Sequence, residues 1–268
     1  MSSPLVTVTI CCYNGERYLE RTLVSVLAQD YLNFEIVIVD DGSTDGTAKI
    51  VERFASQYDC IRAFFRSNHG LPASRNYSFA QAQGEWIAII DQDDLWYPTR
   101  LSRQLGLARS YPTAGFIFCN AHHIDESDEV MGDHLSAYGL PELFIRKGDA
   151  GNLLLTEGCY SASVACLIRR ETVRAVGTFD ETIPYACDYD YFIRAGFEVG
   201  FAYTRDSLAA WRKHAEQATS TYGKRDREIR SVFWRYWRGV KASGWTKAIL
   251  FKRILKSVVG GIVRKVFR

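Results

Sequence analysis

Short, mostly hydrophobic segments alternate with segments of helical spacing in the first third of the chain. The hydrophobic segments lie at residues 5–12, 34–39, 61–65 and 86–90. The segment at 86–90 is uninterrupted, which is typical of a strand buried on both faces of a parallel sheet. Between the runs, apolar residues such as Leu19, Leu23 and Val26 recur every three or four positions, which predicts helices. Strands alternating with helices favour an α/β fold with a mostly parallel, doubly wound sheet.

The pattern becomes less regular beyond residue 98. We expect a helix at residues 99–110 and strands at 114–119 and 164–168, whereas residues 126–148 are polar without a clear period. The adjacent pair His122 and His123 would face opposite ways in an extended segment, so it makes a poor metal chelate and is assigned a structural or loop role.

Charge is distributed unevenly along the chain. The 268 residues carry a net charge of +2, yet residues 224–268 hold 14 of the 33 basic and 2 of the 31 acidic residues, giving this tail +12 and the remainder −10. Apolar positions at helical spacing between these charges predict basic amphipathic helices. We expect the tail to contact an anionic membrane surface; the alternative is packing on the main domain or a second subunit. Nucleic acid is not an expected partner, because no recognition motif accompanies the charge.

The cysteines and the chain ends indicate a reducing compartment. Seven cysteines without a CxxC pair suggest free thiols rather than a disulfide framework or a zinc site. The first residues lack the basic and apolar regions of a signal peptide, and no apolar run reaches the roughly 18 residues of a spanning helix. We therefore expect a cytoplasmic protein, peripheral on the inner face of the cell membrane.

Three carboxylates follow the apolar run at 86–90. In extended backbone Asp91 and Asp93 would share one face, roughly 6–7 Å apart, and point into one crevice. Such a cluster is costly unless compensated, and carboxylates suit a hard divalent cation, Mg²⁺ or Mn²⁺, that also holds phosphate oxygens. The carboxyl ends of strands in open α/β sheets are where ligands bind. The alternative is a solvated loop whose aspartates cap the helix after Pro98.

A second carboxylate pair, Asp40 and Asp41, follows the run at 34–39. Such a pair can hydrogen-bond a base or a ribose, although an Asp-Gly turn explains it equally well. Two common nucleotide-binding classes are disfavoured, because the first strand is not followed by GxGxxG and no GxxxxGK[ST] occurs.

Five motifs, in order and spread over residues 5–220, resemble the inverting glycosyltransferases of family two, which have the A-type nucleotide-diphospho-sugar transferase fold. They are Cys12-Tyr13-Asn14-Gly15-Glu16, Val39-Asp40-Asp41-Gly42-Ser43-Thr44-Asp45, Gly70-Leu71-Pro72-Ala73-Ser74-Arg75-Asn76, the stretch from Gly84 to Asp94, and Gly177-Thr178-Phe179-Asp180-Glu181. The resemblance implies a nucleotide-binding half at about residues 1–97 and an acceptor half at about 98–223, followed by the helical tail at 224–268.

The resemblance also implies roles for residues in the first half. Tyr13 and Asp40 would contact the nucleotide base, and Arg75 the nucleotide or its diphosphate. Asp91 would contact the ribose, and Asp93 would bind the metal that bridges the diphosphate.

Further roles fall in the second half. By resemblance, Asp188 is the base that deprotonates the acceptor hydroxyl. Cys187 stands where the family usually has a glutamate. Asp190 reads as a first-turn acid that complements the helix dipole. His214 matches a histidine that can complete the metal or diphosphate site, with an ordinary structural role equally weighted. Residues 158–163 would lie near the donor sugar.

Together these features predict a metal-dependent inverting glycosyltransferase that uses UDP, GDP or dTDP sugars. Its acceptor would be a glycan or a lipid-linked glycan of the cell envelope. A nucleotidyltransferase and a non-catalytic membrane- or partner-binding scaffold on the same fold are the rivals, and a homodimer is left open.

Overall fold

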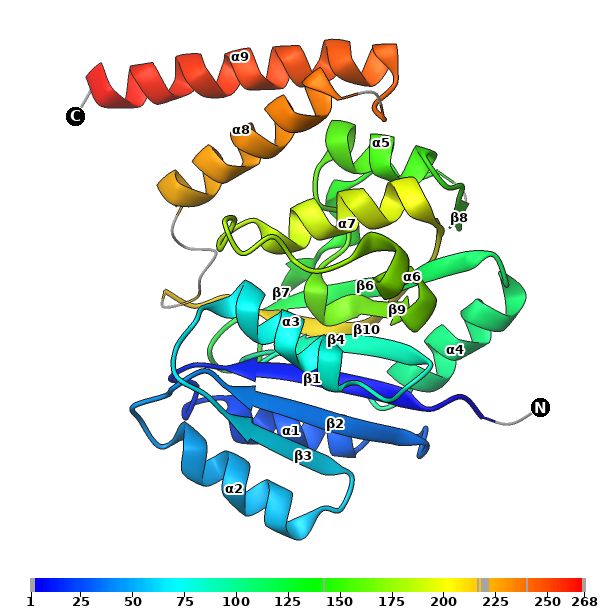
Figure 1. Cartoon of the computed structure of the whole chain (residues 1–268), viewed down its shortest axis with the longest axis vertical. Coiled ribbons are helices and arrows are strands. Elements are labelled where there is room, and N and C mark those ends of the chain that lie inside the picture. Colours follow the sequence, from blue (N-terminus) through cyan, green and yellow to red (C-terminus); the bar gives the residue numbers. More distant parts are fainter. Residues whose placement is uncertain (1–2, 142, 216, 218–221, 240, 267–268) are drawn as a thin grey trace.

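The computed structural model describes residues 3–141, 143–215, 217, 222–239 and 241–266, with side chains in the last helix described as far as Leu255. The first third alternates strands and helices as expected (Figure 1). Its elements are β1 (Val6–Cys12), α1 (Leu19–Leu27), β2 (Phe34–Asp40), α2 (Thr47–Gln57), β3 (Ile61–Phe65), α3 (Leu71–Gln81) and β4 (Trp86–Asp91).

The remaining chain adds strands to the same sheet and helices around it. The elements are β5 (Leu95–Trp96), α4 (Arg100–Ser110), β6 (Ala114–Ile124), β7 (Val130–Asp133), β8 (Phe144–Ile145), α5 (Asp149–Glu157), β9 (Cys166–Arg169), α6 (Arg170–Val176), α7 (Cys187–Glu198), β10 (Gly200–Arg212), α8 (Tyr222–Arg238) and α9 (Gly244–Val266). The expected end of β6 at residue 119 was wrong. The strand continues through His122 and His123 because β10 and β7 pair with it on its two sides.

The sheet has the strand order β3-β2-β1-β4-β9-β6-β10-β5. Strands β3, β2, β1 and β4 are mutually parallel, β6 and β10 are parallel, and β9 is antiparallel to both of its neighbours. The expected α/β fold with a mostly parallel sheet is therefore confirmed, with β9 inserted between its two parallel parts.

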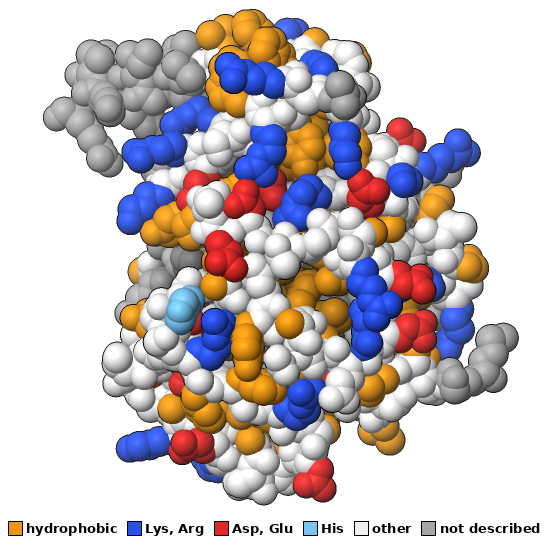
Figure 2. Space-filling view, in the orientation of Figure 1, with side chains coloured by type: hydrophobic (Ala, Val, Ile, Leu, Met, Phe, Trp, Pro, Cys, Tyr) orange, Lys and Arg blue, Asp and Glu red, His pale blue; other side chains and the backbone are white. Residues whose placement is uncertain are grey.

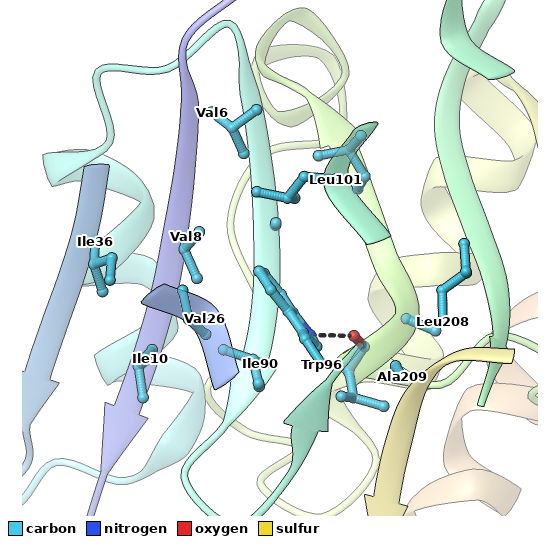
Figure 3. Close-up of a cluster of buried hydrophobic side chains, with 14 of the residues drawn as sticks. Val6, Val8, Ile10, Val26, Ile36, Ile90, Trp96, Leu101, Leu208 and Ala209 are labelled. Carbon is cyan, nitrogen blue, oxygen red and sulfur yellow. Dashed lines mark hydrogen bonds between the residues drawn. The ribbon is translucent and has the colours of Figure 1, made fainter. Parts of the chain in front are cut away.

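Side chains from the two faces of the sheet enter two hydrophobic cores. Ile117 joins the core under α1, α2 and α4, whereas its neighbours Phe116 and Phe118 join the core under α5 and α7. Figure 3 shows the first core, in which Trp96 packs among strand residues and donates from Nε1 to the Val164 carbonyl (2.9 Å). This burial on both faces explains why β4 is a continuous apolar run, whereas β1 and β2 also bury the polar side chains of Thr7, Thr9 and Glu35.

The tail forms two helices that pack on the second core. Val232 and Phe233 of α8 and Leu250 and Ile254 of α9 are buried there. In Figure 1 these helices lie at the end of the molecule away from α2. Packing on the main domain, the alternative to membrane contact, thus accounts for one side of the tail; the apolar side chains beyond Leu255 lie outside the described residues. Within the part of the chain that is described, no helix is both long and apolar enough to cross a membrane.

Candidate active site

The strand register gathers three of the expected site residues at one edge of the sheet. Cys12 of β1 lies beside Asp40 of β2, and Cys11 lies beside Asp91 of β4. Because the three strands are parallel, their carboxyl ends meet there, and Tyr13 follows directly after β1. The structure thus brings Tyr13, Asp40 and Asp91 together, as the motif positions suggested.

The segment after β1 is clamped to the segment after β4. The Gln92 side-chain amide accepts the Tyr13 N–H (2.8 Å) and donates to the Tyr13 carbonyl (3.1 Å). A Cβ at Gly15 would displace the Gln92 amide from this position, so glycine preserves the clamp. The Tyr13 ring remains 48% exposed, which leaves it free to stack on a planar ligand.

The Asp40 and Asp41 carboxylates accept hydrogen bonds from backbone N–H groups of neighbouring turns. Asp40 Oδ1 accepts the Ser43 N–H (3.0 Å), and the Asp41 carboxylate accepts the N–H groups of His69 (3.0 Å) and Gly70 (2.8 Å) just before α3. Both aspartates are buried. The turn interpretation therefore accounts for these bonds, and base recognition by Asp40 stays a prediction.

The acidic cluster does not have the extended geometry that we expected. Strand β4 ends at Asp91 and residues 92–93 form a turn, with the Asp94 N–H near the Asp91 carbonyl (3.3 Å). Each carboxylate consequently meets a different group. Asp91 Oδ1 accepts from Arg75 (2.7 Å), Asp93 Oδ2 lies 2.7 Å from His214 Nε2, and buried Asp94 accepts the Arg212 N–H (2.9 Å).

Arg75 connects Asp91, which is expected to contact the ribose, to Asp188, the expected base. Its side chain is 1% exposed and forms ion pairs with both Asp91 and Asp188. Ser163 Oγ donates to the other Asp188 oxygen (2.5 Å). The Cys187 thiol lies 3.7 Å from Arg75, and burial raises its pKa, so Arg75 meets a neutral thiol where the family pattern has a carboxylate.

Asp190 lies in the first turn of α7, as expected. It is also fully buried and accepts from Arg194 (2.8 Å) and from Arg235 of α8 (3.0 Å). It therefore joins the tail to the helix that carries Asp188.

Asp93 and His214 form a pair suited to a divalent cation. Within the described residues, no three His, Cys, Asp or Glu side chains come together to hold a metal ion, so protein ligands alone do not complete such a site. The pair offers a carboxylate oxygen and an imidazole nitrogen at the edge where Asp91 lies, and buried His214 Nδ1 has no hydrogen-bond partner among the residues that the structure describes. An imidazole ligand favours Mn²⁺ over the more strictly oxygen-liganded Mg²⁺, and a ligand's phosphate oxygens could supply the missing coordination.

A pocket of about 370 Å³ opens beside these residues. Its lining combines three carboxylates, a group of aromatic and histidine side chains, and the loop before β9. The lining residues include Asp91, Asp94, Asp188, His123, His134, Tyr138, Trp211, Cys159, Ser161, Ala162, Ser163, Tyr185, Tyr189 and Arg225. Residues 158–163, expected near a sugar, thus contribute to a pocket that also contains the expected base.

Burial shifts the ionisation of several groups around the pocket. It raises the pKa of Asp94 well above its ordinary range, helped by the charges of Asp93 and Asp91. It lowers the pKa of His134 from 6.5 to about 4, helped by His123, and that of Lys213 from 10.5 to about 8. His134 is consequently neutral near pH 7.

Several residues of this site were missed by sequence reasoning. Ser163 belongs to the segment expected near the donor sugar but had no role of its own. Trp211 had no assigned role, and Arg225 was counted only in the net charge of the tail. Fully buried Arg212 donates to the Asp93 (2.8 Å) and Asp125 (2.8 Å) carbonyls. It belongs to the arginine-x-histidine segment that identified His214, but it was assigned no role of its own.

Several known proteins are similar in sequence to this chain. An uncharacterized glycosyltransferase of Rickettsia typhi is 29% identical over 222 residues, covering 82% of this chain and 67% of the relative. An uncharacterized glycosyltransferase of Nostoc sp. is 34% identical over 181 residues, covering 65% of this chain and 54% of the relative. The chain thus spans about half to two thirds of the length of these relatives.

Solved structures share its fold. S. aureus TarS 1–349 in complex with UDP-GlcNAc matches with a TM-score of 0.71 at 19% identity, over 94% of this chain and 72% of that one. Mannosyltransferase PcManGT from Pyrobaculum calidifontis, in complex with GDP-Man and Mn²⁺, matches with a TM-score of 0.69 at 21% identity, over 94% and 70%. The family model for glycosyl transferase family 2 matches residues 7–177. Because that match covers more than half of its length, the chain belongs to glycosyl transferase family 2.

Proposed function

We propose that this protein is a metal-dependent, inverting glycosyltransferase that moves a sugar from a nucleotide diphosphate to a glycan or lipid-linked acceptor. The observation that supports this most directly is that Asp188 and Asp91 line one pocket and are linked through Arg75. A base and a nucleotide-side carboxylate are then adjacent. Family membership favours this activity over nucleotidyl transfer and over a non-catalytic scaffold.

In the proposed reaction, Asp188 accepts the proton of an acceptor hydroxyl as that oxygen attacks the anomeric carbon. Attack comes from the face opposite the diphosphate, so one displacement inverts the anomeric centre and needs no covalent intermediate. Ser163 and Arg75 hold the Asp188 carboxylate on both sides, which fixes its orientation before the acceptor arrives.

The Tyr13, Asp40 and Asp91 edge would take the nucleotide, and the Asp93 and His214 pair would hold Mn²⁺ or Mg²⁺. A bound divalent cation would supply electrostatic stabilisation of the leaving diphosphate. The complexes of TarS with UDP-GlcNAc and of PcManGT with GDP-Man and Mn²⁺ support a nucleotide-sugar donor without selecting the base. A place for the acceptor in a cell-envelope polysaccharide remains a prediction from the family resemblance.

Calorimetric titration with UDP, GDP and dTDP, each with and without Mn²⁺, tests this proposal. We expect one diphosphate to bind tightly only with metal, and this tight binding to be lost in Asp93→Ala. Ser102→Ala, far from the site on α4, serves as a control. Absence of binding by all three diphosphates in the presence of metal would refute the donor site.

We also propose that the outward side of the tail contacts an anionic membrane surface. Trp234 (38%), Trp245 (69%), Phe251 (49%) and Leu255 (54%) are exposed. Exposed Arg238, Lys241 and Lys252 belong to the same tail, and Figure 2 shows hydrophobic and basic side chains adjoining at that end of the molecule. Aromatic side chains among cations suit the headgroup region.

Vesicle sedimentation tests the membrane proposal. Binding should require phosphatidylglycerol, weaken at high salt, and fall several-fold in Trp245→Ser with Phe251→Ser. Equal binding to neutral phosphatidylcholine vesicles, or no loss in the double variant, would contradict it.

A further inference from the structure

Arg225, in the first turns of α8, lines the pocket that contains Asp188. It shares that lining with Tyr138, Tyr185 and Tyr189. Its guanidinium forms no ion pair or hydrogen bond with any residue that the structure describes, in contrast to the paired arginines Arg75, Arg194 and Arg235. Of the carboxylates in the same lining, Asp91 and Asp188 are paired with Arg75, and the raised pKa of Asp94 favours its neutral form. A partly buried guanidinium that faces the pocket with no ion-pair partner among the described residues is suited to an anionic ligand, because it offers several donors in a planar fork.

Helix α8 is held firmly beside the pocket. Glu228 accepts the N–H groups of Tyr185 (2.8 Å) and Ala186 (2.9 Å) immediately before α7. Arg235 bridges Asp180 (2.9 Å) and buried Asp190 (3.0 Å). These contacts fix the helix at positions three and ten residues beyond Arg225, so its placement on the pocket wall is built into the packing of the tail.

The groups proposed to hold the base and the metal lie outside this pocket. Asp93 and His214, the candidate metal pair, are not among the residues lining it, and Tyr13 and Asp40 are also absent from its lining. Asp91 and part of the 158–163 segment, expected beside the ribose and the donor sugar, line it together with Asp188, so the pocket lies where donor sugar and acceptor would meet. Because the diphosphate would be held at the Asp93 and His214 pair, we assign an anion at Arg225 to the molecule that approaches Asp188.

We propose that Arg225 is a specificity-determining residue that binds an anionic group, a phosphate or a carboxylate, on the acceptor. The inference rests on the proposed glycosyl transfer at Asp188. Nearby Lys213, whose ammonium lies 2.9 Å from the Trp211 ring centroid, adds positive charge on the side of the pocket formed by Trp211. The tail thereby contributes to acceptor choice through its first turns.

The test uses the full chain saturated with UDP and Mn²⁺, so that the donor site is filled. Glucose 6-phosphate, glucuronate and glucose serve as matched probes, and their binding is followed by NMR titration. We expect one or both anionic sugars to bind about tenfold or more tightly than glucose, as a charge-assisted contact implies. The stronger of the two identifies phosphate or carboxylate as the preferred group.

Three variants assign the effect to Arg225. Arg225→Gln should reduce binding of the anionic sugar to the level of glucose, and Arg225→Lys should retain part of the preference. Arg227→Gln, which removes the same charge from an exposed position on α8, should leave it unchanged.

The opposite results overturn the inference. They are equal binding of glucose and the anionic sugars, an unchanged preference in Arg225→Gln, an equal loss in Arg227→Gln, or displacement of UDP by glucose 6-phosphate, which would assign the anion to the donor site. Failure of UDP itself to bind with Mn²⁺ would instead refute the proposed function, so the two failures are distinguishable.

Discussion

Removal of the Glu228 carboxylate should weaken the packing of α8 against α7, the helix that carries Asp188, and lower the free energy of unfolding. Glu228 Oε2 accepts two backbone N–H groups, those of Tyr185 and Ala186, at the amino end of α7. Ala186 is 4% exposed, so its N–H would lose its partner without gaining full access to water. Glu228→Ala is therefore the perturbation, and Glu228→Gln keeps an acceptor oxygen while removing the charge.

The contacts set the size of the effect. An unsatisfied buried N–H costs about 1–3 kcal/mol, and the loss of a hydrogen bond to a charged group costs about 1.5–3 kcal/mol. The N–H of half-buried Tyr185 can be partly resolvated, so we expect Glu228→Ala to lower the free energy of unfolding by about 3 kcal/mol. Glu228→Gln should lower it by only about 1 kcal/mol. For a chain of this size, 3 kcal/mol corresponds to a decrease in Tm of roughly 6–12 °C.

Urea unfolding followed by far-UV circular dichroism measures this difference, and calorimetry gives the Tm. Asp226→Asn is the matched control, because it removes an acid two residues away whose side chain has no partner among the described residues. The argument fails if Glu228→Ala unfolds within about 0.5 kcal/mol of the wild type. It also fails if Asp226→Asn is equally destabilising, since general charge effects would then explain the result.

Two further predictions follow from the site. Asp188→Asn should lower turnover by about 10²- to 10⁴-fold while UDP affinity, measured by calorimetry, stays within about twofold; normal turnover would remove Asp188 as the base. Burial lowers the pKa of His134 to about 4, so the folded chain binds a proton there less readily than the unfolded chain. The contribution of neutral His134 to the free energy of unfolding is therefore fully present above about pH 6.5 and is lost as the pH falls toward 4. Between pH 7.5 and 5 this loss should be about 2 kcal/mol by urea unfolding, and His134→Gln should remove most of that dependence; an unchanged slope would contradict it.

The sequence by itself determined the alternation of elements and the place of the site. Hydrophobic segments that alternate with helical spacing predicted parallel strands, and the uninterrupted run of β4 predicted burial on both faces because such a strand leaves no polar positions between apolar ones. Motif order identified the residues at the carboxyl ends of β1, β2 and β4, which parallel pairing must bring to one edge. Asp91 and Asp188 were named from their motifs without knowledge of their separation in space.

Local patterns were less informative where partners come from distant parts of the chain. The extended geometry assumed for Asp91 and Asp93 failed because residues 92–93 turn, and Arg212, more than a hundred residues away, holds the Asp93 carbonyl and the Asp94 carboxylate there. Strand β6 likewise extends beyond its apolar segment, because His122 and His123 pair with β7 and β10.

Only the tertiary structure decided which charged residues meet. The contact of Arg75 with both Asp91 and Asp188 joins residues separated by 16 and 113 positions, and no periodicity records such a pairing. The tail shows the same limit. Its composition revealed positive charge and amphipathic spacing, but the packing of Val232 and Leu250 on the second core selects which face is buried. That packing, a long-range consequence of apolar burial, turns Arg225 toward the pocket and leaves Trp245 exposed.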